Sequence, residues 1–364
     1  MAPRAPLLPL AAVALLLGCT QSPPARPCER PRCRTVGERA PAFVGGDPAE
    51  KGWVKADDGL LWVEARDAEA FRAGRLRLGD GTVPFAEADR VPKSADGGYA
   101  LRTDHLLLRT NVTFGRAREL AALAEAHVGR VLEVYGPALD LRLPEDPLRL
   151  VVAARRPEFG RLLQEKVSDP VEWGAFYDAR DGIVYASDEP LGQGGVGVVA
   201  DLRHELTHAI LDLGRPEAGR ARMFLRPHFW IWEGSALYAE GLGDPAGARA
   251  GHERFARFER RLAWGEAVPL ATLFALGQDA FVGRHYDQTA SFMRWLLDGD
   301  GGVRRAPTLA LLSRVMDGDG ATGDFERILG MSAGDAEARW LASLGHRPAP
   351  PPAAPPVPGG SAGR

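Results

Sequence analysis

Apolar residues follow two different spacings along the chain, and the change falls near residue 196. Before that point, short apolar runs alternate with Asp-Gly and Gly-Asp-Gly turns or with amphipathic segments, which is typical of strands mixed with a few helices. The elements predicted there are a small β-rich module at 46–100, strands at 105–109 and 148–153, helices at 113–135 and 157–166, and a hairpin over 175–186. From 196 to about 345 the pattern is predominantly helical. This order predicts an α+β fold with a mixed sheet, a helical half and a cleft between the two.

The two ends of the chain differ in composition from the middle. Residues 1–18 carry one early positive charge, Arg4, then an apolar stretch too short to span a bilayer comfortably, and small residues before Cys19; this is the layout of a signal peptide. Residues 19–45 are rich in Pro, Arg and Gly and predict a flexible tether. Residues 346–364 are mostly Pro and Ala and predict a disordered tail. The folded part therefore lies between these segments.

Cys19 follows Leu16-Leu-Gly in a pattern that resembles a lipobox, in which a signal peptidase cuts before the cysteine and the cysteine carries the lipids. The alternative is an ordinary signal peptide with an incidental cysteine. Thr20 is not the aspartate that retains lipoproteins at the inner membrane. The resemblance therefore implies a lipid anchor at Cys19 in the bacterial cell envelope, at the outer membrane and facing the periplasm or the outside. Cys28 and Cys33 then form a close pair in an oxidising compartment, which predicts a local disulfide unless both are free thiols.

Charge and composition narrow the classes of partner. The 45 basic and 48 acidic residues give a formal net charge of -3, and no long run of one sign is present to follow a phosphate backbone. A hydrophobic content of 45% is enough for a large core in a chain of 364 residues. The sequence therefore predicts a globular protein and argues against a nucleic-acid partner.

The sequence His204-Glu-Leu-Thr-His208 places two histidines four residues apart within a predicted helix. That spacing puts both imidazoles on one face, within reach of a single zinc ion, with Glu205 beside them. A wide apolar face and the stop signal at Gly214, with Pro216 beyond it, support the helix. The other face is polar, and so many polar groups on a largely buried helix are costly unless something binds them. The members of this polar stripe are Asp201, His204, Glu205, His208 and Asp212.

Glu233 is the predicted third ligand, because a catalytic zinc ion takes three protein ligands and leaves a fourth position to water. It ends the aromatic run Phe229-Trp-Ile-Trp-Glu233, a setting that a solvated surface glutamate explains poorly. The small residues 234–236 after it should let this second helix approach the first. The sequence therefore predicts one Zn²⁺ per chain, held by His204, His208 and Glu233.

The stretches Leu202-Arg-His-Glu-Leu-Thr-His208 and Trp232-Glu-Gly-Ser-Ala-Leu-Tyr-Ala-Glu240 resemble the gluzincin zinc metallopeptidases, and within them the bacterial peptidase MA-like group. The resemblance implies a metallopeptidase domain at 101–345. It implies zinc-dependent hydrolysis of peptide bonds in a peptide or unfolded protein, with Glu205 as the general base. In related aminopeptidases a tyrosine on the helix after the third ligand donates to the oxyanion, and Tyr286 is the match. The alternative for Tyr286 is a buried aromatic side chain with a packing role.

One departure from the family bears on the substrate. The aminopeptidase branch uses a Gly-Ala-Met-Glu-Asn strand whose glutamate binds the free amine of the substrate, and the match here reads Gly174-Ala-Phe-Tyr-Asp178. Because Tyr177 replaces that glutamate, the resemblance favours an endopeptidase that cuts extended or unfolded chains. Two other classes stay open: an inactive binding lipoprotein on a peptidase fold, and a zinc hydrolase acting on a non-peptide substrate.

Two supporting assignments follow from sequence position. Carboxylates normally hold ligand imidazoles in one tautomer, and Asp201, Asp212 and Glu240 are the candidates for this role. The sequence does not choose among them. His127 lies in the apolar stripe of the helix at 113–135 and is predicted to be a core histidine.

Overall fold

The structure is a computed structural model that describes residues 48–346, with gaps at 50–51, 57–58, 79–80, 91–97, 165, 168–173, 191–197, 216–228, 243–244, 319 and 321–322. The chain divides into two units, Met1–Arg39 and Ala40–Arg364, and all described residues belong to the second. The predicted signal peptide, the tether, the tail beyond His346 and all three cysteines lie outside the described residues.

The order of elements follows the prediction, and the α+β class is confirmed. The described strands are β1 Trp53–Lys55, β2 Trp62–Glu64, β3 Arg75–Leu78, β4 Gly81–Pro84, β5 Tyr99–Arg102, β6 Leu106–Thr110, β7 Leu148–Ala153, β8 Ala175–Asp178 and β9 Ile183–Ser187. The described α-helices are α1 Ala68–Arg72, α2 Phe85–Ala88, α3 Phe114–Leu139, α4 Arg156–Leu163, α5 Val198–Leu213, α6 Phe229–Glu240, α7 Pro245–Ala263, α8 Leu270–Ala275, α9 Gly283–Asp298, α10 Arg305–Met316, α11 Asp324–Leu329 and α12 Ala333–Ser343. None of the described helices is both long and apolar enough to cross a membrane.

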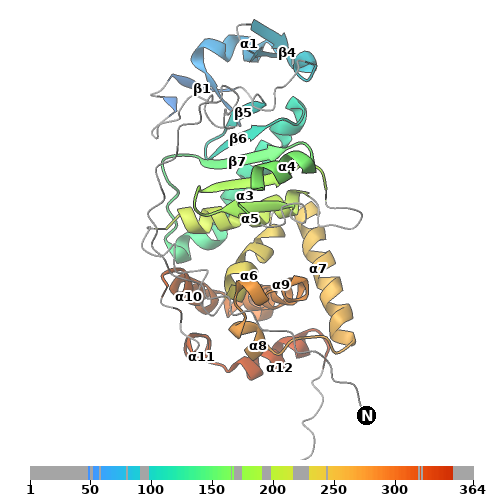
Figure 1. Cartoon of the computed structure of the whole chain (residues 1–364). Coiled ribbons are helices and arrows are strands. Elements are labelled where there is room, and N and C mark those ends of the chain that lie inside the picture. The colour runs from blue at the N-terminus through green and yellow to red at the C-terminus, as the bar shows by residue number, and fades with distance from the viewer. Residues whose placement is uncertain are drawn as a thin grey trace, which may run out of the picture. The chain divides into compact units, whose positions relative to one another are not determined.

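Seven strands form one mixed sheet in the order β1-β2-β5-β6-β7-β9-β8 (Figure 1). Strands β6, β7 and β9 run parallel, and the other neighbours are antiparallel. The predicted hairpin is formed by β8 and β9, with β8 at the edge of the sheet. One row of backbone N–H and C=O groups on β8 therefore faces away from the other strands.

The N-terminal strands extend this sheet instead of forming a module of their own. Trp62 of β2 lies opposite Arg102 of β5, so β1 and β2 continue the larger sheet, and β3 and β4 pair separately. The module boundary predicted at residue 100 falls inside β5. Asp89 ties this segment to the start of α3, because its carboxylate accepts a hydrogen bond from the Phe114 backbone N at 2.8 Å. Strand pairing joins residues far apart in sequence, which is why the local pattern suggested a break here.

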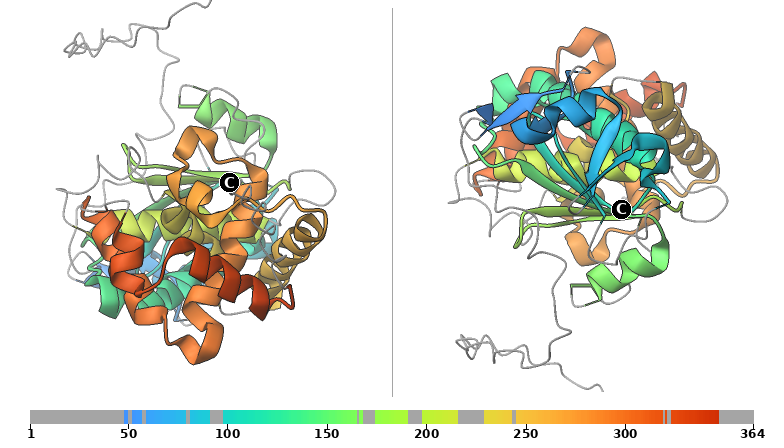
Figure 2. Two further views of the ribbon diagram at one scale, coloured as in Figure 1. Left: turned by 90° about the horizontal axis from the view of Figure 1, so that it is seen from below. Right: turned by 90° about the horizontal axis from the view of Figure 1, so that it is seen from above.

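Helix α5 lies between the sheet and the helical half. It contacts β8, β9 and α3 on one side and α6 on the other. In Figure 1 the sheet lies above α5, and helices α6 and α8 to α12 lie below it. In the view from below (Figure 2, left), the orange and red helices lie in front of the yellow-green α5. The predicted metal helix thus occupies the boundary between the two halves.

Helix α3 packs against α5. Its first turn is capped by Thr113, whose hydroxyl accepts from the Arg116 backbone N at 3.2 Å. It runs past the predicted end at 135 to Leu139, with Pro137 accommodated in the last turn. His127 of α3 is buried, and its Nε2 lies 2.9 Å from the Thr207 hydroxyl of α5. The prediction of a core histidine is confirmed.

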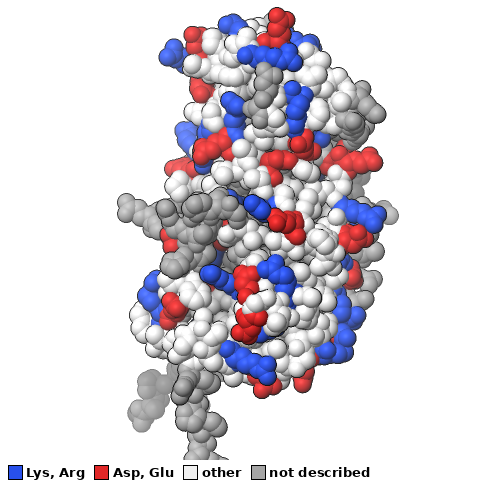
Figure 3. Space-filling view, turned by 180° about the vertical axis from the view of Figure 1, so that it is seen from behind, with Lys and Arg blue, Asp and Glu red and all other residues white. Residues whose placement is uncertain are grey.

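Charged side chains on the described surface are mixed in sign. On the face shown in Figure 3, Lys and Arg are intermingled with Asp and Glu. Several form short-range pairs, such as Arg130 with Glu133 and Arg155 with Glu158, each at 2.7 Å. A continuous basic stripe, the usual footprint of a nucleic-acid partner, is not visible on the described part of this face.

Candidate metal centre

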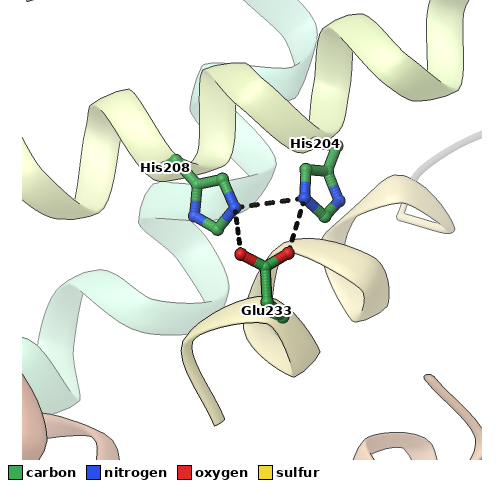
Figure 4. Close-up of side chains that lie close together, drawn as sticks. All are labelled: His204, His208 and Glu233. Atoms are coloured by element: carbon green, nitrogen blue, oxygen red, sulfur yellow. Dashed lines mark hydrogen bonds and ion pairs between the residues drawn. The ribbon is translucent and has the colours of Figure 1, made fainter. Parts of the chain in front are cut away.

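The two predicted histidine ligands lie one turn apart on α5 and point toward α6 (Figure 4). Their Nε2 atoms are 3.1 Å apart, and their ring planes meet at 84°. Both side chains are largely buried, at the boundary between the sheet and the helical half. Helical periodicity brings His204 and His208 together, because residues four apart share a face.

Glu233 reaches the same point from α6 (Figure 4). Its Oε2 lies 3.1 Å from His204 Nε2, and its Oε1 lies 3.6 Å from His208 Nε2. One ligand atom from each of the three residues lies within 4.8 Å of the others, so the cluster could hold a metal ion. Donors about 2.0–2.1 Å from a tetrahedral zinc ion lie about 3.3 Å from one another. The observed separations therefore fit a single ion of that size.

The charges around this cluster favour a cation. Burial alone would raise the pKa of Glu233, but the neighbouring His208 and His204 lower it to about 2. Burial alone would lower the pKa of His204, but hydrogen bonds to Glu233 and Glu240 raise it well above its usual value. The negative charges of Glu233 and Glu240 around the two imidazoles therefore favour a cation at this position. The donor set of two imidazoles and one carboxylate suits zinc.

Glu240 is the candidate carboxylate that contacts a ligand imidazole. Its Oε1 lies 2.9 Å from His204 Nδ1, and the side chain is fully buried. Asp212 is engaged elsewhere, since its Oδ2 accepts a hydrogen bond from the Tyr177 hydroxyl at 2.6 Å. The second ligand, His208, stacks on Trp232 with ring centroids 4.6 Å apart, and its Nδ1 has no hydrogen-bond partner among the described residues.

Glu205 contacts the edge strand of the sheet. Its Oε2 accepts a hydrogen bond from the Tyr177 backbone N at 2.8 Å. Because β8 is the edge strand, this N–H belongs to the row that faces away from β9. The predicted general base therefore lies next to His204 in sequence, between α5 and the outward edge of β8.

Asp201 lies one helical turn before Glu205 on α5. A Cβ atom on Gly174, just before β8, would lie 2.0 Å from Asp201 Oδ2, so a larger residue there would displace the Asp201 side chain. Burial and the charge of Glu240 raise the pKa of Asp201 to about 7. Glu240, one of the three candidates, makes the predicted contact with a ligand imidazole.

Tyr286 belongs to α9 and is half-buried, with its ring 4.9 Å from that of Phe281 in an edge-on contact. Burial and the negative charges of Glu233 and Glu205 raise its pKa. The structure thus brings Tyr286 into the electrostatic field of the metal cluster, although it lies some fifty residues beyond Glu233 in sequence.

The small residue after the third ligand faces a different helix from the one expected. A Cβ atom on Gly234 would lie 3.0 Å from Thr289 Cγ2 and 3.4 Å from Met293 Cβ, both on α9. Consecutive helix residues point about 100° apart, so when Glu233 faces α5 its neighbour cannot. Of the small residues 234–236 expected to let α6 approach α5, Gly234 instead lets α6 approach α9, the helix that carries Tyr286.

Two functional candidates on other helices were missed by sequence reasoning. Arg254 of α7 donates to Glu240 from Nε at 2.9 Å and from Nη2 at 3.0 Å. Asp287 of α9 is buried and accepts from Arg257 at 2.8 Å. The Arg254–Arg257 spacing on one helix face was the available signal, but it is shared by many solvated helices.

No protein-family model matches the chain, and no curated protein matches it either. The assignment of function therefore rests on this geometry.

Proposed function

We propose that this protein is a zinc-dependent peptidase of the gluzincin type, with one zinc ion held by His204, His208 and Glu233. The observation that carries the proposal is the convergence of these three donors next to Glu205, which contacts the edge strand β8. Separations of 3.1–3.6 Å between the donor atoms fit a tetrahedral ion. A cluster of buried charges with no chemical role would be costly to retain.

Each residue of the site has a distinct part in the proposed reaction. A zinc ion at this position would supply Lewis acidity to the scissile carbonyl and acidify water. Glu205 takes the proton from the attacking water and passes it to the leaving amine. Tyr286 donates its hydroxyl hydrogen bond to the oxyanion of the tetrahedral intermediate. Its raised pKa keeps that hydroxyl protonated at neutral pH, as a donor must be.

The neighbourhood of β8 favours internal cleavage of an extended chain. A peptide can add to a free sheet edge through main-chain hydrogen bonds, which read no particular sequence. The Tyr177 hydroxyl donates to buried Asp212, so this position offers no free carboxylate for a substrate amine. We therefore propose endopeptidase action on peptides or unfolded proteins, by an enzyme anchored to the cell envelope through Cys19.

The test is a digest of a mixed peptide library in which half of the peptides have acetylated N-termini. The protein as purified should cut both halves at internal positions, because no free amine is required. Glu205→Gln should retain the metal and the Tyr177 hydrogen bond, since its amide oxygen still accepts, while hydrolysis falls by about 10²–10⁴-fold. Cleavage restricted to free N-termini would contradict the endopeptidase assignment, and unchanged hydrolysis by Glu205→Gln would contradict the mechanism.

A further inference from the structure

A continuous line of charged side chains leads from the metal cluster to the helix that carries Tyr286. His204 Nδ1 lies 2.9 Å from Glu240 Oε1. Arg254 holds the same carboxylate with two hydrogen bonds, at 2.9 and 3.0 Å, and its Nη1 lies 3.8 Å from Asp287 Oδ1. Arg257 then holds Asp287 with bonds of 2.8 and 3.0 Å. The line joins α5, α6, α7 and α9.

Burial restricts the motion of the side chains in this line. The side chain of Glu240 is 0% exposed, that of Asp287 3% and that of Arg254 14%. Water therefore cannot substitute for a missing partner at Glu240, and the direction of its carboxylate depends on His204 and Arg254 alone among the described side chains. A two-pronged guanidinium contact fixes both position and orientation of a carboxylate, which a single hydrogen bond does not.

We propose that Arg254 is a positioning residue for the metal: it aims Glu240 at His204 and, through Asp287, ties the metal ligands to the start of α9. The inference rests on the metal site proposed above and adds to it a residue on a fourth helix that touches neither metal nor substrate. Carboxylates that orient ligand histidines typically contribute 10–100-fold to metal affinity, and a residue that fixes such a carboxylate shares in that effect. Asp287 directly follows Tyr286, so the same contact sets where α9 begins relative to the cluster.

Arg257 provides a matched control on the same helix, one turn further on. Arg257 donates to Asp287 at 2.8 Å, and Arg254 lies 3.8 Å from the same carboxylate. Among the described side chains, Arg254 contacts Glu240 and Arg257 does not. Replacing either arginine by Met removes one cation from Asp287. Only the change at Arg254 also releases Glu240. A difference between the two variants therefore isolates the path to the metal.

The experiment measures the zinc dissociation constant of the whole protein by competition with a chelator, together with the melting temperature of the metal-free form. Arg254→Met should raise the dissociation constant by about 10-fold or more, and Arg257→Met should change it by less than about 2-fold. Arg254→Lys keeps the charge without the two-pronged contact. Its zinc dissociation constant should therefore lie between those of the wild type and Arg254→Met. Arg254→Lys also supplies the test if the methionine variant does not fold.

The outcomes separate this inference from the proposed function. Unchanged zinc affinity in the Arg254 variants, or an equal loss in Arg257→Met, overturns the positioning role while leaving the metal site intact. A wild-type protein that binds no zinc overturns the proposed function itself. The double variant Arg254→Met with Glu240→Gln should bind zinc no more weakly than the weaker single variant, because both changes act through His204. Additive losses would contradict a shared path.

Discussion

Glu205 and Tyr286 are the two proposed catalytic side chains, and each has a contact that the structure defines. The Glu205 carboxylate rests on the Tyr177 backbone N at 2.8 Å, and the Tyr286 ring rests edge-on against Phe281 at 4.9 Å. Neither is a metal ligand in this geometry. Their expected effects on catalysis can therefore be separated from effects on metal binding.

Tyr286→Phe is expected to lower kcat by about 100-fold, because it removes one donor aimed at developing negative charge. KM and metal content should stay nearly constant, since no ligand and little packing volume is lost. If Tyr286 has only a packing role, the opposite result is expected. The kcat of Tyr286→Phe is then normal, and its melting temperature falls if loss of the hydroxyl leaves a hydrogen-bond partner unsatisfied. Measuring kcat, KM, bound metal and melting temperature on this one variant decides between the two roles.

Asp201→Asn is expected to stabilise the metal-free protein in a pH-dependent way. The folded-state pKa of Asp201 is raised from 3.8 to about 7 by burial and by Glu240, so ionising this carboxyl disfavours folding. The wild type therefore loses stability as pH rises from about 4 to about 7, whereas the neutral asparagine does not. The gain in melting temperature of Asp201→Asn over wild type should be larger at pH 8 than at pH 5. An equal difference at both values would show that Asp201 is not buried as described.

At the scale of the element, the sequence predicted where helices lie along the chain but not which segments they pack against. The position of α5 follows from apolar spacing of 3.6 residues, and that of α6 from an apolar run buried on nearly every side. Both are local properties of the sequence. The partner of each helix face depends on packing between segments distant in sequence. Gly234 illustrates this, since it contacts α9 and not α5. The contact between Arg254 and Glu240 could not be predicted for the same reason. The local sequence does not determine which carboxylate an arginine on a helix will contact.

Gly234→Leu is expected to cost about 1–3 kcal/mol in the free energy of unfolding, because the new side chain overpacks the contact with Thr289 and Met293. Gly129→Ala is the matched control: this glycine lies exposed within α3, with nothing within 4 Å of its added Cβ. It should gain about 0.5–1 kcal/mol from helix propensity. Urea unfolding measures both. A Gly234→Leu protein as stable as wild type would mean that α6 and α9 are not in close contact.

At the scale of the whole molecule, α5 and α6 bring the three possible donors together at the boundary between sheet and helical half. The α+β class and the order of elements could be predicted from sequence, because strand and helix periodicities are local. The extent of the sheet could not. Strands β1 and β2 join it through the single pair Trp62 and Arg102, a contact between residues forty apart in sequence. The convergence of His204, His208 and Glu233 could be predicted because two share a helix face and the third lies in a run too apolar for the surface.

The central claim is that one zinc ion, held by His204, His208 and Glu233, is required for peptide hydrolysis. It is tested most directly by titrating zinc into the metal-free protein while following cleavage of an unfolded substrate. The rate should rise from near zero and reach a plateau at one zinc ion per chain, and Glu233→Ala, which lacks one donor, should show no such plateau at the same concentrations. Full hydrolysis without metal, or a wild-type titration curve in Glu233→Ala, would contradict the account.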